Sequence, residues 1–168
     1  MLSGFAYDAC YNHSAQSMKN YFLVWDYAIN QGFAFGSGMG TNHHYGYQIR
    51  KIYTTAWLMR DAIWKAPNRD NILSALIFWS ALQETRIPYQ YGRDELLDSW
   101  HTLLMPKTIS ALMFVDERER ARALTGLSRW LSGSLQYSPG TIGGIKVDGT
   151  TFHHGGFYPA YTTGVLAM

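Results

Sequence analysis

The chain of 168 residues is long enough for one domain with a hydrophobic core, and its 47% apolar content is typical of globular proteins. A net charge of +2 is too small to indicate a nucleic-acid partner, and no run of about 18 apolar residues predicts a membrane span. The single cysteine, Cys10, excludes an internal disulfide and a CxxC zinc motif.

Helical periodicity dominates the N-terminal half. A helix is expected over residues 14–31 with Ser14 as its N-cap. The stretch 32–46 holds five glycines and is predicted to be a loop. Helices are then expected over residues 47–65 and over residues 70–85, where apolar side chains on nearly all sides predict burial.

The C-terminal half is also predicted to be largely helical. A short helix is expected over residues 93–104, and a second, with Pro106 in its first turn, runs to Phe114. Asp116 begins the last helix as part of a sequence that resembles a capping box. The apolar stripe of that helix is Ala121, Leu124, Leu127, Leu131 and Leu135.

A turn-rich segment follows Ser138 and is expected to hold a short hairpin around Ile145 and Val147. Alternation of apolar and polar residues is weak elsewhere, so no large sheet is expected. The predicted fold class is therefore all-α, with successive antiparallel helices joined by short loops.

Histidines gather in three places, each beside aromatic residues: His43 and His44, His101, and His153 and His154. Each one alone fits a structural role, but two adjacent pairs in glycine-rich segments favour a functional site. Three or four imidazoles could also bind zinc or copper, although HExxH and an i, i+4 pair are missing. The acidic residues expected to be solvated or to cap helices are Glu84, Asp94, Glu95 and Asp98.

The run DGTTFHHGGFYPAY, from Asp148 to Tyr161, carries the clearest chemistry. His154 can change charge near neutral pH, and Tyr161 can act as an acid or, with a lowered pKa, as a base. Gly155 and Gly156 lie between them and suit a loop on which a polar ring approaches the backbone. The pair predicts proton transfer that needs neither a metal nor an organic cofactor.

This run resembles the catalytic segment of the chondroitin sulfate ABC lyases, in the polysaccharide lyase family that also holds chondroitin AC, hyaluronate and xanthan lyases. The family's pattern is Asp-Gly, a short aromatic spacer, His, and a Tyr seven to nine residues later. The segment Thr41–Ala62 is similar to a second stretch of the ABC branch, where His-His-aromatic-Gly-Tyr precedes a helix. The segment Asp98–Leu103 resembles a third, in which the position of His101 is often Asn.

The resemblance implies that residues 1–168 form part of a catalytic domain, an incomplete α/α toroid of antiparallel helix pairs, with no second domain. It implies cleavage of chondroitin or dermatan sulfate by β-elimination at the uronic acid, which yields unsaturated oligosaccharides. His154 and Tyr161 match the catalytic histidine and tyrosine, and His101 matches the group that neutralises the substrate carboxylate.

The resemblance also implies further substrate-binding residues. His44 and His153 match positions associated with accepting the second uronic-acid epimer. The candidates for stacking on sugar rings are Tyr45, Trp100 and Tyr158, with core packing equally expected for Trp100.

Elimination requires no organic cofactor, and the resemblance leaves room for a divalent cation, calcium or magnesium, without assigning metal ligands. The implied partners are a glycosaminoglycan and the remainder of a parent enzyme, which supplies an Arg and a Glu further along the chain. The family implies a periplasmic or secreted location, although the first residues show no signal-peptide pattern. Two alternatives stay open: an inactive truncated toroid that binds uronate polymers, and a histidine-rich metal-dependent hydrolase.

Overall fold

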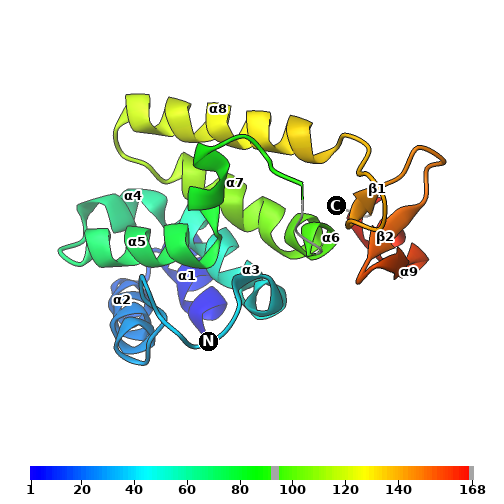
Figure 1. Ribbon diagram of the computed structural model, residues 1–168. Helices are drawn as coiled ribbons and strands as arrows, with labels where there is room; N and C mark the ends of the chain where they lie inside the picture. The colour runs from blue at the N-terminus through cyan, green and yellow to red at the C-terminus, as the bar shows by residue number, and fades with distance from the viewer. Residues whose placement is uncertain (92–94, 167–168) are drawn as a thin grey trace.

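The computed structural model describes residues 1–91 and 95–166, and helices make up most of it (Figure 1). The prediction of an all-α fold is confirmed. Within the described residues, no helix combines the length and apolar character needed to cross a bilayer. The helices are α1 (Leu2–Tyr11), α2 (Ala15–Asn30), α3 (Asn42–Leu58), α4 (Arg60–Lys65), α5 (Arg69–Trp79), a 3-10 helix (Leu82–Arg86), α6 (Leu96–Asp98), a π-helical turn (Ser99–Leu103), α7 (Leu104–Leu112), α8 (Glu117–Ser134) and α9 (Pro159–Leu166).

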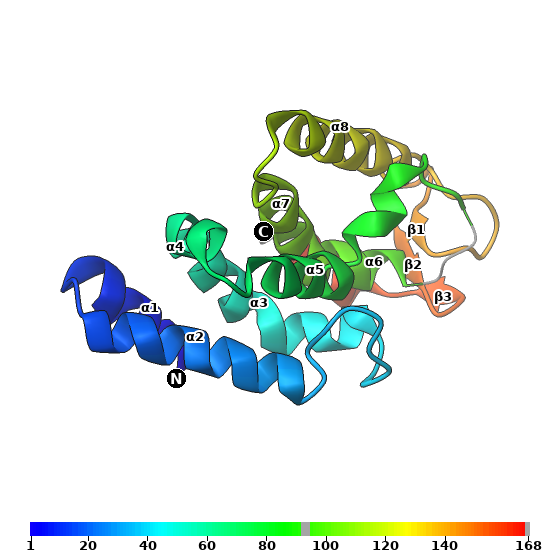
Figure 2. The ribbon, with the colours of Figure 1, turned by 90° about the vertical axis from the view of Figure 1, so that its left-hand side faces the viewer.

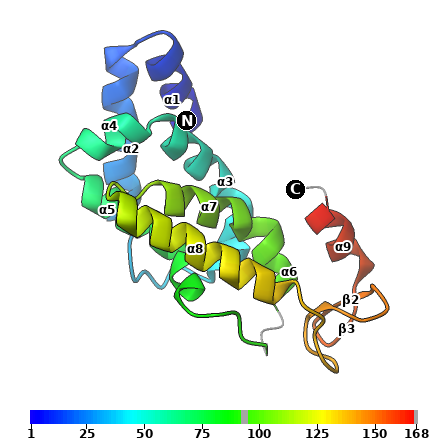
Figure 3. The ribbon, with the colours of Figure 1, turned by 90° about the horizontal axis from the view of Figure 1, so that it is seen from above.

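The helices stack in layers, with a small sheet at one end (Figures 1 and 2). The long helix α8 packs on α7 and on the 3-10 helix, whereas α1 packs on α2 and α3. Viewed from above, the strands and α9 lie at the opposite end of the molecule from α1 and α2 (Figure 3). At that end, α9 contacts α6 and the π-helical turn.

The small sheet confirms the predicted hairpin and adds one strand. Its antiparallel register pairs Ile145 with Thr151, while Val147 lies outside the strands and is exposed. Between them, the buried ammonium group of Lys146 donates hydrogen bonds to Ser138 Oγ at 2.9 Å and to the Ser138 carbonyl at 3.3 Å. These bonds fix the segment that leads into the sheet. The strands, in spatial order, are β1 (Gly144–Ile145), β2 (Thr151–His153) and β3 (Gly156–Phe157).

The predicted helix starts are confirmed where a capping side chain defines them. The Ser14 hydroxyl accepts a hydrogen bond from the Ser17 amide at 3.2 Å at the start of α2. The Asp116 carboxylate accepts one from the Glu119 amide at 2.9 Å at the start of α8. Pro106 lies in the first turn of α7, where its missing N–H has no cost.

The predicted glycine-rich loop ends earlier than expected, at Thr41. His43 and His44 therefore lie in the first turn of α3 and not in a loop. The reason is that Gly46 serves close packing rather than a turn. A Cβ atom at Gly46 would lie 2.5 Å from Thr102 Cβ, so only glycine allows the two helical segments to approach this closely.

Other helix boundaries also differ from the sequence predictions. No side chain caps α1, so its start carries no sequence signal. The predicted helix 47–65 is divided at Met59, and the one expected over 70–85 ends at Trp79, where Ala81 adopts a left-handed φ of +53°. The predicted start at residue 93 lies outside the described residues, and the helix that follows begins at Leu96.

The main apolar core lies between α1, α2, α3, α4, α5 and α7. A second, smaller group of buried apolar residues includes Leu97, Trp100 and Trp130 and connects α8 with α6. The predicted stripe of α8 is partly wrong, because Leu127 is buried with Trp130, whereas Leu135 is exposed. The fully buried residues of the main core with the largest side chains are Tyr21, Trp25, Tyr53, Met59, Ile63, Ile72, Leu76, Trp79 and Met113.

Candidate active site

Asp98 lies at the centre of a group of side chains from four elements. Its carboxylate is buried on α6 and accepts a hydrogen bond at Oδ1 from the Tyr47 hydroxyl of α3, at 3.4 Å. The Nε2 atom of His153, a fully buried residue of β2, lies 3.5 Å from Asp98 Oδ2. The ring of Tyr161, on α9, has its centroid 4.4 Å from that of His153. We call these four side chains the Asp98 cluster.

The cluster keeps its two phenols protonated. Partial burial, followed by the negative charge of Asp98, raises the pKa of Tyr161 to about 12. A hydrogen bond with Asp98 acts in the same direction, because a carboxylate accepts the proton of the neutral phenol. Partial burial and Asp98 also raise the pKa of Tyr47. Both phenols are therefore proton donors near neutral pH, and a base role for Tyr161 requires an added positive charge.

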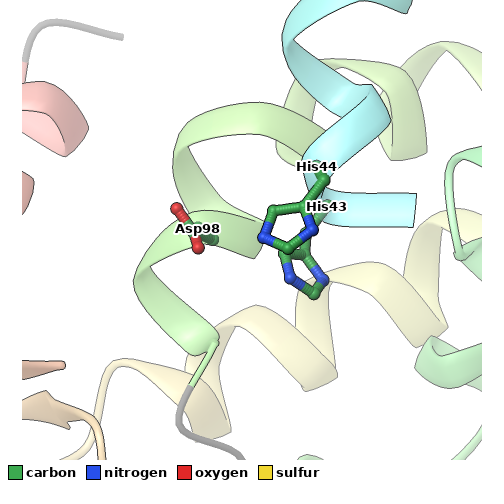
Figure 4. Close-up of side chains that lie close together, drawn as sticks. All are labelled: His43, His44 and Asp98. Carbon is green, nitrogen blue, oxygen red and sulfur yellow. The ribbon is translucent and has the colours of Figure 1, made fainter. Parts of the chain in front are cut away.

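The two histidines at the start of α3 face this cluster. The rings of His43 and His44 have centroids 4.3 Å apart, and His44 Nδ1 shares a hydrogen bond of 2.7 Å with Thr41 Oγ1. Burial, followed by the neighbouring His44, lowers the pKa of His43, which favours its neutral, proton-accepting form. Figure 4 shows both imidazoles opposite the carboxylate of Asp98.

His101 lies beside the cluster in the π-helical turn. Its ring centroid is 5.5 Å from that of Tyr47, and its side chain is partly exposed. The Arg50 guanidinium donates a hydrogen bond to the His101 carbonyl and so ties the turn to α3. The structure thus places His44, His153 and Tyr161 around Asp98, with His101 beside Tyr47.

His154 occupies the turn between β2 and β3. It is exposed and has a left-handed φ of +51°, a conformation in which few residues other than glycine are found. Its ring centroid is 3.9 Å from that of His153, and the latter ring lies against Tyr161. His153, the last residue of β2, is therefore buried, whereas His154, the first residue of the turn, is exposed.

The three aromatic residues proposed to stack on sugars differ in their surroundings. Trp100 is buried, and its indole nitrogen donates to Ser134 Oγ at 3.0 Å, so the structure favours core packing over sugar stacking. Tyr45 is half-buried against Trp79, with ring centroids 5.1 Å apart. Tyr158 is 43% exposed and touches Tyr161 edge-on, which makes it the best placed of the three to meet a ligand.

Sequence reasoning missed the central role of Asp98, which was expected to be solvated or to cap a helix. The same expectation is wrong for Glu84, which forms an ion pair of 2.8 Å with the buried Lys107. Both partnerships join residues far apart in the chain, so local spacing carries no sign of them. Glu95 is half-buried, and Asp94 lies outside the described residues. Asp98 does begin one of the three recognised segments, which was the available signal.

A comparison with protein families assigns the chain to a family. A family model described as "Lyase, catalytic" matches residues 1–168, and the chain belongs to that family. The resemblance to the chondroitin sulfate ABC lyases is thereby confirmed at the level of the family.

Three individual relatives show which members of the family this chain is similar to. The chain is 35% identical over 154 residues to the chondroitin sulfate ABC exolyase of Bacteroides thetaiotaomicron, covering 90% of this chain and 15% of the relative. It is 31% identical over 150 residues to the chondroitin sulfate ABC endolyase of Proteus vulgaris, covering 88% of this chain and 15% of the relative. An exolyase from Proteus vulgaris is 33% identical over 147 residues, 85% of this chain and 14% of that relative. The chain thus spans about 15% of the length of these relatives.

Proposed function

We propose that this chain is the part of a polysaccharide lyase that carries proton-transfer groups for β-elimination in chondroitin and dermatan sulfate. The observation that carries the proposal is the convergence of Tyr161, His153 and Asp98 from α9, β2 and α6. Membership of the lyase family and the names of the relatives support the substrate class.

The reaction requires an acid and a base on a uronic acid. A base takes the proton from the carbon beside the carboxylate, a carbon–carbon double bond forms, and the bond to the glycosidic oxygen breaks as that oxygen takes a proton. The high pKa of Tyr161 suits the acid that protonates the leaving oxygen. In this arrangement the base is an imidazole, with His44, His153 and His154 as the candidates.

The substrate carboxylate must be neutralised, since its negative charge makes the neighbouring carbon proton only weakly acidic. His101 is proposed for this role, because its partly exposed ring lies beside Tyr47 at the edge of the Asp98 cluster. Glucuronate and iduronate present the reacting proton on opposite faces. Tyr161 as both base and acid for glucuronate would need its pKa lowered, and His154 is proposed either to lower it or to take the proton.

Three further features belong to the same proposal. Tyr158 offers an exposed ring for sugar stacking, whereas the half-buried Tyr45 offers a smaller surface. A parent enzyme acting in the periplasm or outside the cell supplies the remaining groups. No organic cofactor is needed, and calcium or magnesium assists by binding the anionic polymer.

Ultraviolet absorbance of the unsaturated product tests the proposal directly. The parent chain and its Tyr161→Phe variant are incubated with chondroitin sulfate and with dermatan sulfate. Loss of one general acid lowers the rate by roughly 100- to 10,000-fold. The exposed Tyr137, 61% accessible and on no site element, provides the control Tyr137→Phe, which keeps the parent rate. Equal rates for Tyr161→Phe and the control would remove Tyr161 from the mechanism.

The short span of the chain relative to its relatives favours a second candidate, an inactive fragment that binds the same polymers. It predicts no absorbance change but binding of chondroitin sulfate that is weakened by His101→Ala. Family membership gives no support to the alternative of a metal-dependent hydrolase.

A further inference from the structure

Three side chains, two at the start of α3 and one on α6, form a compact set of metal-binding donors. One ligand atom each from His43, His44 and Asp98 lies within 4.8 Å of the other two. Figure 4 shows the two imidazoles side by side at the start of α3, with the Asp98 carboxylate to one side of them. We propose that these three residues form a binding site for a transition-metal ion of the Zn²⁺ or Co²⁺ type.

The distances suit such an ion after a small adjustment. Imidazole nitrogens and carboxylate oxygens bind zinc at about 2.0–2.2 Å, so two ligands of one ion lie at most about 4 Å apart. The present separations therefore need side-chain movements of less than about 1 Å, which rotation of the exposed His44 ring can supply.

The surroundings hold the donors in place. Metal-binding histidines usually hydrogen-bond through the second ring nitrogen, and Thr41 Oγ1 meets His44 Nδ1 at 2.7 Å, which leaves Nε2 for the ion. The Tyr47 hydroxyl donates to Asp98 Oδ1 at 3.4 Å and orients the carboxylate in the same way. His44 is exposed, so solvent can reach the ion and supply a water molecule as the fourth ligand.

The donor set also selects the metal. Two imidazole nitrogens and one carboxylate oxygen suit Zn²⁺, Co²⁺ and Ni²⁺, whereas Ca²⁺ and Mg²⁺ prefer sites made of six or more oxygens. The site is therefore distinct from the calcium or magnesium role proposed above. Its geometry stands whether or not the chain is a lyase.

Binding would join α3 to α6, which are far apart in sequence. An ion bound to the folded state and not to the unfolded chain raises the melting temperature, and the rise grows with ion concentration. Co²⁺ adds a second readout, because its visible absorption intensifies when three protein ligands and one water surround it in a tetrahedral arrangement.

The test titrates the 168-residue chain with Zn²⁺ by calorimetry and with Co²⁺ by visible absorption, beside His43→Gln, His44→Gln and Asp98→Asn. We expect one ion to bind per chain. Removing a residue that only supports a metal ligand lowers metal affinity by roughly 10- to 100-fold. Each variant removes a ligand itself, so we expect its affinity to fall by at least that much. The matched control is His13→Asn, which changes an exposed histidine with a left-handed φ of +55° to a residue that tolerates that conformation. It should bind Zn²⁺ as the parent does.

Each outcome decides the proposal. Zn²⁺ affinity within about threefold of the parent in His43→Gln and His44→Gln would overturn it, since measured affinities of true ligand variants differ by far more. The proposal would also be overturned if Ca²⁺ or Mg²⁺ displaced Co²⁺ from the parent chain as readily as Zn²⁺ does. If circular dichroism shows that Asp98→Asn is unfolded, the two histidine variants alone give the answer. Lyase activity is not a readout here, so failure of the metal site and failure of the proposed function are separable.

Discussion

Two regions of this molecule, which we call its two ends, bury different kinds of side chain: the main core around α5 and the region around α6. Around α5 the main core is aromatic and aliphatic, and Trp79 stacks on Phe33 with ring centroids 5.5 Å apart. Around α6 the smaller apolar group of Leu97 and Trp100 also buries two titratable groups, the carboxylate of Asp98 and the imidazole of His153. Apolar burial stabilises the fold at the first end, whereas buried polar groups at the second end cost free energy unless they are well hydrogen-bonded. The difference indicates which end supplies stability and which supplies chemistry.

The two ends also differ in how they are held. The main core uses side chains that recur along each helix, so every helix brings several contacts. The Asp98 cluster takes single side chains from α3, α6, β2 and α9, and its position depends on a few supporting contacts. One is the Thr102 hydroxyl, which donates to the Asp98 carbonyl at 2.8 Å. A small displacement of that support should therefore harm the site more than the core.

The largest effect on stability is expected from the core. Replacing the fully buried Trp79 by alanine should lower the free energy of unfolding by about 3–5 kcal/mol, because the transfer free energy is lost and a cavity remains. Urea unfolding followed by circular dichroism measures the loss. The control is Trp57→Ala, which removes a 37% exposed ring that meets Arg60 at 4.6 Å and should cost no more than about 1 kcal/mol. Equal losses from the two variants would contradict the assignment of stability to the buried aromatic core.

A smaller effect is expected where the two ends meet. Gly46→Ala would place a methyl group 2.5 Å from Thr102 Cβ, so α3 and the π-helical turn must separate. Overpacking of this kind costs about 1–3 kcal/mol. Because Thr102 supports Asp98, we also expect the proposed lyase activity to fall under conditions in which the variant is still folded.

The matched control for this prediction is Gly38→Ala. A Cβ atom at Gly38 meets no other atom within 4 Å, so the added methyl group should leave stability and activity as in the parent. Denaturant unfolding and the absorbance assay are run on both variants. If Gly46→Ala unfolds like Gly38→Ala and keeps its activity, the close approach of the two helical segments does not position the site.

The contrast between the two ends explains how much the sequence could predict. Local signals identified α2 and α8, because Ser14 and Asp116 cap them, and periodic apolar residues such as Tyr21 and Trp25 mark a buried face. They failed at Gly46, which was interpreted as part of a loop although it lies in a helix. The requirement for glycine there comes from Thr102, a contact that no local pattern contains.

The site was predictable in part for the same reason. The resemblance selected His44, His101, His153, His154 and Tyr161. Four of these lie around Asp98 and Tyr47, whereas His154 is exposed in the turn after β2. The resemblance marked residues to examine but did not give their positions. It did not reveal that Asp98 is buried between them, since a carboxylate on a short helix is normally solvated. Burial of Asp98 depends on Tyr47 and His153, and those contacts exist only after folding.

The smallest predicted effect is a shift in the titration of one phenol. The parent titration in the near ultraviolet, minus that of Tyr161→Phe, isolates this group and should give a pKa of about 12 in place of the ordinary 10.0. In the Asp98→Asn background the pKa should fall, because the negative charge and the charged acceptor that disfavour the phenolate are gone. The control is the titration of the exposed Tyr137, obtained by subtracting the titration of Tyr137→Phe, and its pKa should be the same in the parent background and in the Asp98→Asn background.

Since the folded pKa of Tyr161 is raised, its contribution to stability is complete below pH 10 and is lost as the pH rises to about 12. A parent difference titration centred on the ordinary value would show that Asp98 does not act on Tyr161, and the two ends would then differ in burial but not in electrostatics.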